Sequence, residues 1–280
     1  MMIAVTGCEG QLGRAVSEVC VERGIPFHAF NRTTLNITDP EAVKKTFEKD
    51  DFDCIIHCAA YTAVDVAEDH PKDAFSVNAY GPWLLARTGV PILSVSTDYV
   101  FDGTASVPYE TEAACRPLSV YGLSKRAGET ALLEGGFHGA ILRTAWVYSK
   151  REGTKNFYQT IRRLASERTE LNVVDDQVGA PTLAEDLAST LVTLYEKGVH
   201  INPMQILHFT NAGSCSWFDF ASEIVRQANL AATVHPIPTS AYPTKAIRPR
   251  FSVLSLSSIE RYGILPRYWK EALADQTLTS

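Results

Sequence analysis

Long apolar runs, blocks of positive charge and paired cysteines are all absent from this 280-residue sequence. No apolar stretch reaches the roughly 20 residues that a helix needs to cross a bilayer. Lysine and arginine number 26 against 32 acidic residues, and this net charge of −6 argues against a nucleic-acid-binding protein. Because the N-terminal residues run directly into an apolar strand instead of a charged signal region, we expect a cytoplasmic protein.

Six cysteines are scattered along the chain without a C-x-x-C pair or another paired metal-ligand spacing. Cys54 and Cys58 lie in an apolar run typical of a buried strand, and His57 between them does not complete a zinc site. We therefore expect reduced core thiols and no bound metal. His57, His138 and His208 are assigned to packing or to the surface, and we find no internal repeat or low-complexity tract.

Apolar segments alternate with amphipathic ones through the first half of the chain, which is typical of a parallel sheet covered by helices. We predict an α/β protein with a Rossmann-like doubly wound parallel sheet and a smaller C-terminal substrate-binding lobe. The predicted strands are 3–6, 25–30, 54–58, 91–96, 140–143, 171–174 and 206–210. The predicted helices are 11–23, 71–87, 156–168, 182–197 and 217–228, with one more opening at Pro40 and one carrying Tyr121.

The alternation loosens beyond Ser149, which predicts a division into two parts. Residues 1–148 form the predicted dinucleotide-binding core, with part of 183–210 returning to it, and 149–280 form mainly the substrate-binding lobe. Residues 97–118 form a long irregular stretch, and loops of this length in a compact domain usually carry function.

Three glycines follow the first predicted strand and open the first helix, in the pattern Gly7-x-x-Gly10-x-x-Gly13. In such a turn the first glycine permits a tight bend, the second lets a pyrophosphate approach, and the third allows close helix–strand packing. The spacing differs from G-x-G-x-x-G, and glycines at a strand–helix turn can be purely structural. Their place in the first βαβ unit favours dinucleotide binding.

The end of the second strand is where ribose recognition occurs in this kind of unit, and here it carries Asn31 and Arg32 instead of an acidic residue. Arg32 can pair with the 2′-phosphate of NADP(H), and the alternative is a solvated surface arginine. We expect NADPH, with NADH as the second candidate.

Tyr121 and Lys125 are four residues apart, a spacing that places both on one face of a helix that Ser119 would cap. We expect the ammonium to lower the pKa of the phenol and make it a usable proton donor. Thr97 ends the fourth strand, at the edge where ligands of open α/β sheets bind, and its hydroxyl can polarise a carbonyl group. A Tyr–Lys pair alone is common by chance; its occurrence with the glycines, Thr97 and Asn78 favours carbonyl reduction or its reverse.

These residues resemble the extended short-chain dehydrogenase/reductase superfamily, and within it the dTDP-4-dehydrorhamnose reductase family, over nearly the whole chain. The matching segments are 5–7, 11–13, 59–65, 77–79, 96–103, 117–122, 143–148, 174–177, 179–182, 239–244 and 248–249. The later segments distinguish nucleotide-sugar reductases from other members of the superfamily.

The resemblance implies that the C4 ketone of a dTDP-linked 4-keto-6-deoxysugar, dTDP-4-dehydro-L-rhamnose, is reduced by NAD(P)H to dTDP-L-rhamnose. Tyr121 would protonate the C4 oxygen, Lys125 would hold the nicotinamide ribose, and Thr97 would bond the carbonyl oxygen. The implied cofactor-binding residues are Gly7, Gly10, Gln11, Leu12, Gly13, Asn31, Arg32, Ala59, Ala60, Tyr61, Asn78, Ser96, Tyr121 and Lys125. The implied substrate-binding residues are Val64, Thr97, Asp98, Tyr99, Trp146, Asn156, Gln177 and Arg248, with Arg248 near the diphosphate.

The sequence departs from the family in three places. The segment from Asn78 to Thr97 is about one helical turn shorter, and Val66 stands where a lysine is frequent. Some members bind magnesium between subunits through acidic side chains; Glu185 matches one of these, but Ala15 replaces another, so we predict no metal. A homodimer is one candidate for the assembly.

Two other functions stay open at this point. The chain could be a reductase or epimerase for another nucleotide-linked deoxysugar. It could also be a non-catalytic regulatory subunit that retains a dinucleotide site, a reading that the intact set of Thr97, Tyr121 and Lys125 disfavours.

Overall fold

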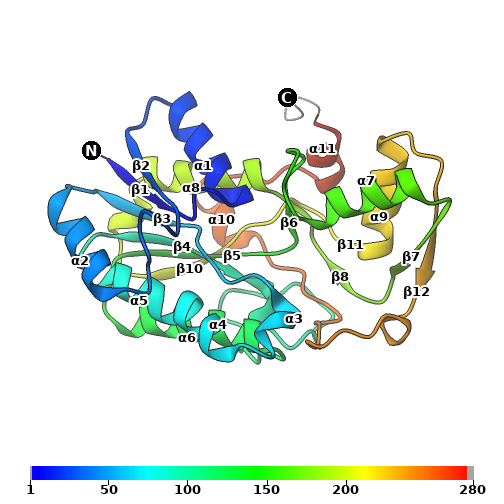
Figure 1. The fold of residues 1–280 in the computed structure, drawn as a ribbon, viewed down its shortest axis with the longest axis horizontal. Coiled ribbons are helices and arrows are strands. Elements are labelled where there is room, and N and C mark those ends of the chain that lie inside the picture. The colour runs from blue at the N-terminus through cyan, green and yellow to red at the C-terminus, as the bar shows by residue number, and fades with distance from the viewer. Residues whose placement is uncertain (1, 276–280) are drawn as a thin grey trace.

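A parallel sheet of six strands forms the centre of the computed structural model, which describes residues 2–275, so the last five residues of the predicted lobe lie outside it (Figure 1). The strand order is β2-β1-β3-β4-β5-β10, so that β1 lies between β2 and β3. The strands are β1 (Ile3–Thr6), β2 (Phe27–Phe30), β3 (Cys54–His57), β4 (Ile92–Thr97), β5 (Gly139–Thr144) and β10 (Gln205–His208). The predicted doubly wound parallel sheet is confirmed.

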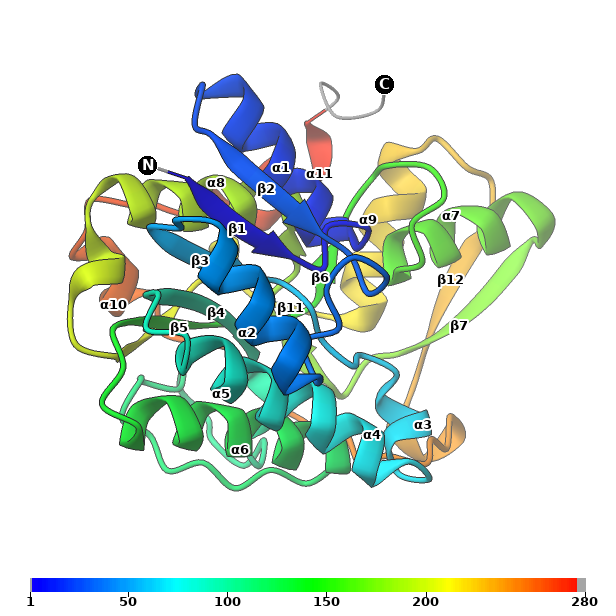
Figure 2. The same cartoon turned by 60° about the vertical axis from the view of Figure 1, so that its left-hand side comes forward.

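Helices cover both faces of the sheet because successive strand residues point in opposite directions (Figure 2). Ile3 and Val5 pack with helices on one face, and Ala4 between them packs on the other. The first face carries α1 (Gln11–Glu22), α8 (Ala184–Glu196) and α10 (Ser257–Glu260), and the second carries α2 (Pro40–Lys49), α5 (Gly81–Ala86) and α6 (Val120–Glu134). Asp39 caps α2 by accepting from the backbone N–H groups of Glu41 and Ala42.

The helix predicted over 71–87 is interrupted. It consists of α4 (Pro71–Phe75), a π-helical turn (Ser76–Tyr80) and α5, and it follows the short α3 (Val64–Ala67). Gly128 of α6 lies against the π turn, where an added Cβ would stand 2.2 Å from the carbonyl oxygen of Asn78. Single π turns are frequent at functional sites, and this one brings the backbone of Asn78 against α6.

The second half of the chain divides between the sheet and a separate apolar cluster. α8 and β10 belong to the sheet, whereas α7 (Phe157–Glu167), α9 (Trp217–Gln227) and α11 (Trp269–Ala274) enclose their own core (Figure 1). β7 (Glu170–Val174) and β12 (Thr233–Ile237) form a parallel pair beside it. Two short strand pairings join the remaining elements: β6 (Val147–Tyr148) pairs with β9 (Thr182–Leu183), and β8 (Val178–Gly179) pairs with β11 (Cys215–Ser216). We call α7, α9, α11, β7 and β12 the C-terminal lobe.

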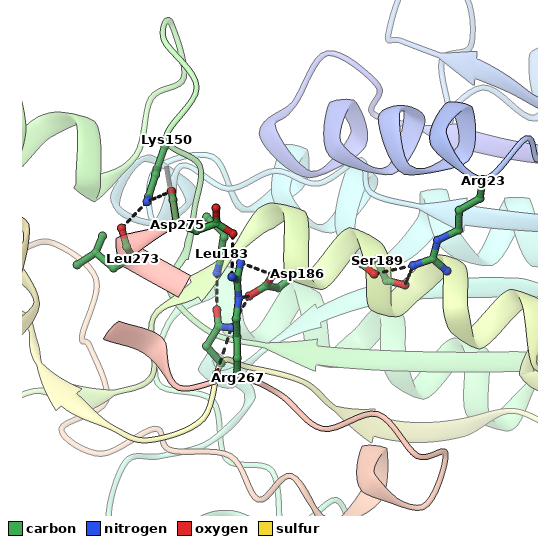
Figure 3. A network of polar contacts seen from close by, with 9 residues as sticks. Arg23, Lys150, Leu183, Asp186, Ser189, Arg267, Leu273 and Asp275 are labelled. Atoms are coloured by element: carbon green, nitrogen blue, oxygen red, sulfur yellow. Dashed lines mark hydrogen bonds and ion pairs between the residues drawn. The ribbon is translucent and has the colours of Figure 1, made fainter. Parts of the chain in front are cut away.

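A polar network ties α11 to the sheet half of the molecule (Figure 3). Arg267 donates to both carboxylate oxygens of Asp186 in α8 at 2.8 Å, and to Asp275 at 2.8 Å. The buried Lys150 donates to the backbone carbonyls of Leu273 and Asp275. Within residues 2–275, no helix is long and apolar enough to cross a membrane.

Candidate active site

A cleft of about 1490 Å³ opens at the carboxyl edge of the sheet and extends to the C-terminal lobe. Its walls include the ends of β1, β3, β4 and β5, and β7 with Trp217 on the lobe side. Every residue predicted for the site lines this cleft except Asn78 and Asn156. The structure therefore brings together, in one space, residues that are spread from position 7 to position 248.

The glycine turn fits the close approach of a phosphate group. Gly7 has φ +70°, and a Cβ on Gly13 would stand 2.2 Å from the Gly7 carbonyl oxygen, so neither position accepts a side chain without a shift of backbone. Gly10 is the N-cap of α1 and has no side chain to bond the first N–H groups of the helix. These donors and the positive end of the helix dipole are directed into the cleft, as an anion-binding turn requires.

The ribose end of the cleft contains a carboxylate that the sequence pattern did not reveal. Asn31 donates its side-chain N–H to Glu9, which comes from the glycine turn, at 2.8 Å. Arg32 is exposed, and both Arg32 and Arg14 line the cleft beside Glu9. The cleft lining thus includes two guanidinium groups and one carboxylate, from the glycine turn, the start of α1 and the segment after β2.

Tyr121 and Lys125 lie on the first two turns of α6, which Ser119 caps by accepting from the Gly122 N–H at 3.1 Å, as predicted. Gly122 permits close approach to the turn after β4 (Asp98–Val100), because a Cβ there would stand 2.3 Å from the Tyr99 carbonyl oxygen. As a result the Tyr121 and Tyr99 rings meet edge to face at 5.5 Å between centroids.

Lys125 and Thr97 are anchored to the same strand, β4. The ammonium of Lys125 donates to the Val95 carbonyl at 2.6 Å. The Thr97 hydroxyl donates to Asp98 at 3.0 Å and accepts from the Tyr99 N–H at 3.2 Å. Both groups therefore have fixed positions before any ligand binds.

The sequence predicted that Lys125 lowers the pKa of Tyr121, and the structure without ligands contradicts this prediction. Burial raises the pKa of Tyr121 well above its usual range, a nearby Asp98 adds to this, and the Thr97 hydroxyl acts in the opposite direction. Lys125 is bonded to Val95 and does not counter the burial. Burial also lowers the pKa of Lys125 to about 8. Before ligands bind, the phenol is therefore a protonated, uncharged donor.

Asn78 and Asn156 act on the cleft through other residues. Asn78 is buried, accepts from the Tyr61 N–H at 2.8 Å, and donates to the Tyr61 carbonyl and the Ser124 hydroxyl. Asn156 caps α7 and donates to the Gln11 side chain at 3.1 Å. They hold the loop after β3 and the start of α1 in place, and neither lines the cleft.

The aromatic wall of the cleft depends on two residues that sequence reasoning missed. Trp146 has φ +47° and stacks on Trp217, with 3.5 Å between ring centroids and 9° between planes. Gly179 makes room for this stack, because a Cβ there would stand 2.5 Å from the Trp146 ring. Trp217 and Gly179 lie more than thirty residues beyond Trp146, so no local pattern links them to it.

The remaining predicted substrate residues form the far side of the cleft. Arg248 pairs with Asp65 at 2.6 Å and contacts the Tyr99 hydroxyl at 3.4 Å. Gln177 is buried and donates to Thr239 at 3.0 Å. Burial raises the pKa of Asp98 to about 6 and that of Tyr99 to about 12. Val64, which begins α3, completes this side.

The acidic and sulfur-containing residues do not gather into a metal centre. Among residues 2–275, no group of three or more His, Cys, Asp or Glu side chains could hold a metal ion. Glu185 instead accepts from the Ser149 hydroxyl at 2.9 Å. All six cysteines are free thiols, and His57 is buried and bonded to the Thr6 hydroxyl at 2.7 Å.

Comparison with known proteins agrees with this geometry. A family model described as RmlD substrate binding domain matches residues 1–279. The dTDP-4-dehydrorhamnose reductase of Aggregatibacter actinomycetemcomitans is 39% identical over 97% of this chain and 96% of the relative. The chain belongs to the dTDP-4-dehydrorhamnose reductase family. The spore coat polysaccharide biosynthesis protein SpsK of Bacillus subtilis is also similar, at 36% identity over 98% of this chain and 95% of that protein.

Solved structures of this reductase family have the same fold. The dTDP-4-dehydrorhamnose reductase of Clostridium acetobutylicum superposes with a TM-score of 0.92 at 36% identity, covering 98% of this chain and 97% of that one. The Bacillus anthracis enzyme in complex with NADP has a TM-score of 0.89 at 35% identity, covering 97% and 96%. UDP-glucose 4-epimerase of Thermus thermophilus, at 20% identity and a TM-score of 0.84, shares the fold alone.

Proposed function

We propose that this protein reduces the C4 ketone of dTDP-4-dehydro-L-rhamnose to dTDP-L-rhamnose with NADPH. The observation that carries the proposal is the single continuous cleft in which the glycine turn, the Tyr121–Lys125 pair and Thr97 face a wall from the C-terminal half. Its volume of about 1490 Å³ exceeds that of a typical drug-sized pocket and suits a dinucleotide beside a nucleotide sugar.

The residues present fit a bound NADP(H). The uncapped start of α1 and the side-chain-free surface of Gly7 and Gly13 would receive the pyrophosphate, and Arg32 with Arg14 would receive the 2′-phosphate. The Bacillus anthracis relative holds NADP. When bound, NADPH would supply a hydride to the ketone carbon.

The chain's own groups would supply the proton and the orientation. On substrate binding the Thr97 hydroxyl would exchange its bond to Asp98 for a bond to the ketone oxygen, and Tyr121 would transfer its proton to that oxygen. Burial keeps the Tyr121 phenol protonated at the start, which is the state that reduction requires. The Lys125 ammonium would hold the nicotinamide ribose.

The sugar nucleotide would lie between the two halves of the molecule. Val64, Asp98, Tyr99, Trp146 and Gln177 would contact the sugar, and Arg248 would meet the diphosphate, with its guanidinium oriented by Asp65. The division into a core of residues 1–148, to which part of 183–210 returns, and a lobe formed mainly by 149–280 stays our proposal. The cytoplasmic location and a homodimeric assembly also stay predictions.

The test is a cofactor-oxidation assay with the 4-keto sugar generated in situ by the enzymes that act before it. We expect stoichiometric loss of NADPH absorbance and formation of dTDP-L-rhamnose, identified by NMR. Conversion of a nucleotide sugar without net NADPH oxidation would instead indicate an epimerase. NADPH binding with no turnover of the 4-keto sugar would indicate the regulatory alternative, and either result would refute the proposal.

A further inference from the structure

A buried ion pair lies directly behind the proposed catalytic residues. Glu129 of α6 and Arg143 of β5 are each 2% exposed or less. One carboxylate oxygen of Glu129 accepts from the Ser96 hydroxyl at 2.6 Å and from Arg143 Nε at 2.9 Å. The other accepts from Arg143 Nη2 at 2.8 Å and from Arg126 at 3.0 Å. Four donors thus fix the Glu129 carboxylate in one orientation.

The same carboxylate connects the two elements that carry the reacting groups. Tyr121, Lys125 and Glu129 follow one another at intervals of four residues, so they share one face of α6. On β4, Ser96 bonds Glu129 while its neighbour Val95 accepts from Lys125 at 2.6 Å. Thr97 is the next residue. Glu129 therefore joins α6 to the end of β4 at the level of the proposed catalytic groups.

Arg143 extends this connection to the loop before α6. It donates to the Thr111 carbonyl at 3.1 Å and to the Cys115 sulfur at 3.3 Å, and it lies 5.1 Å above the Phe101 ring. Burial alone would raise the pKa of Glu129, but the bonds and charge of Arg143 outweigh it and hold that pKa below its usual range. The carboxylate is therefore charged at neutral pH.

The charged Glu129 and Lys125 border the same small cavity. Both residues line a cavity of about 10 Å³, together with Asn78 and Ser96. Burial lowers the pKa of Lys125 to about 8, and the Glu129 charge raises it against that effect, with a smaller contribution from Cys58, the residue after β3. His57 of β3 is buried and neutral at this pH, because burial and the Lys125 charge lower its pKa to about 3.

We propose that Glu129 is a positioning residue for the reduction, which keeps the Lys125 ammonium charged and, through Ser96, ties α6 to the strand end that carries Thr97. A buried ion pair is by itself weak evidence for a stabilising role, since apolar residues can fill such a space as well. What points to the reaction is the placement, because the same carboxylate bonds the strand residue between Val95 and Thr97 and borders the same small cavity as Lys125. The predicted effect of Glu129 on the charge of Lys125 does not depend on the proposed function. The predicted effect of Glu129 on turnover does rest on it.

The direct test is the titration of Lys125 in the protein without cofactor, followed by NMR of isotopically labelled lysine side chains and assigned with Lys125→Met. We expect Glu129→Gln to lower the Lys125 midpoint by about one pH unit or more, which is about a tenfold change in the charged fraction above the midpoint. An unchanged midpoint in folded Glu129→Gln would overturn the proposal, whether or not the protein reduces the sugar.

Cofactor binding and turnover give the second readout. The wild type should lose NADPH affinity and kcat as the pH rises through about 8, because Lys125 then loses its proton. In Glu129→Gln both losses should begin about one unit lower, so the deficit should be roughly fivefold at pH 8, approach about tenfold above pH 9 and be small at pH 6. A deficit that is equal at every pH would indicate a structural role and would contradict the proposal.

Two further variants separate charge from folding. Glu223→Gln is the matched control, since Glu223 is also buried and paired with an arginine, Arg226, but lies on α9 away from Lys125. It should leave the Lys125 midpoint unchanged. If Glu129→Gln does not fold, Glu129→Gln/Arg143→Gln removes both buried charges, and its Lys125 midpoint should still fall. A midpoint equal to that of the wild type in the double variant would overturn the proposal.

Discussion

The two sides of the cleft are built with different kinds of contact. On the sheet side, both groups are buried and bonded before any ligand arrives, Lys125 to the Val95 carbonyl of β4 and Thr97, at the end of β4, to Asp98. On the other side, residues 239–248 contact the α3 region through two ion pairs, Arg248–Asp65 and Lys245–Asp69, whose side chains are partly or largely exposed. Water competes with exposed pairs and not with buried bonds. The contrast suggests a fixed reaction geometry and a more adaptable substrate wall.

The C-terminal lobe itself is attached unequally. At α11, Arg267 pairs with Asp186 and Asp275, and Lys150 bonds two backbone carbonyls (Figure 3). At the cleft, residues 239–248 are joined to the α3 region by the two ion pairs just described and by the Ala246 N–H, which donates to Asp65 at 3.0 Å. Adaptability is therefore expected at residues 239–248 and not at the base of the lobe.

The largest expected effect comes from removing the proton donor on the fixed side. Tyr121→Phe keeps the ring and its contact with Tyr99 but deletes the hydroxyl, so kcat should fall by roughly 10²–10⁴-fold. NADPH binding, measured by fluorescence titration, should survive. Undiminished turnover would refute both the mechanism and the contrast between the two sides.

Lys125→Ala should be distinguishable from this variant. It removes the ribose contact as well as the charge, so both NADPH affinity and kcat should fall. A Lys125→Ala protein that binds NADPH as tightly as the wild type would show that the ammonium does not hold the cofactor.

The ribose end of the cleft also lies on the sheet side, but Arg32 there is exposed. Its substitution therefore tests whether an exposed residue on this side contributes to cofactor binding. Arg32→Ala should raise the NADPH dissociation constant by about 5- to 150-fold, for a pairing of roughly 1 to 3 kcal/mol, and leave NADH nearly unchanged. Glu9→Gln should tighten NADPH, because it removes the carboxylate beside the 2′-phosphate. Equal effects of Arg32→Ala on both cofactors would show that Arg32 is only a surface charge.

The aromatic wall should affect substrate more than cofactor. In Gly179→Ala the new methyl group would displace Trp146, which cannot move freely because it stacks on Trp217. We expect KM for the nucleotide sugar to rise by about tenfold, as for an overpacking cost of 1 to 2 kcal/mol, with the NADPH dissociation constant unchanged. Ala180→Gly, next to it, is the control for the substitution itself, and a KM equal to that of the wild type in Gly179→Ala would show that the stack does not contact substrate.

The smallest expected effects are on Tm. They should distinguish the attachment of the lobe at α11 from the contact of residues 239–248 with the α3 region. Arg267→Met removes partly buried bonds to two carboxylates and should lower Tm by about 2 to 4 °C, whereas Lys245→Met should lower it by less than about 1 °C. Differential scanning calorimetry measures both. Equal shifts would show that the two attachments do not differ in strength.

Much of the fold and the reaction centre was predictable because the signals are local. Strand–helix alternation, the Gly7–Gly13 turn, the Ser119 cap and the four-residue spacing of Tyr121 and Lys125 each depend on a few neighbouring residues. Interruption of the 71–87 helix by a π turn was not predictable, since it depends on packing against Gly128 of α6.

The sequence by itself determined which groups are available and on which elements they lie. Only the tertiary structure decided what surrounds them: Glu9 beside Asn31, Trp217 against Trp146, and Glu129 behind Lys125. It also reversed the expected pKa shift of Tyr121. The physical reason is that desolvation and charge interactions depend on atoms brought together from distant parts of the chain. A sequence pattern shows only which residues are neighbours along the chain.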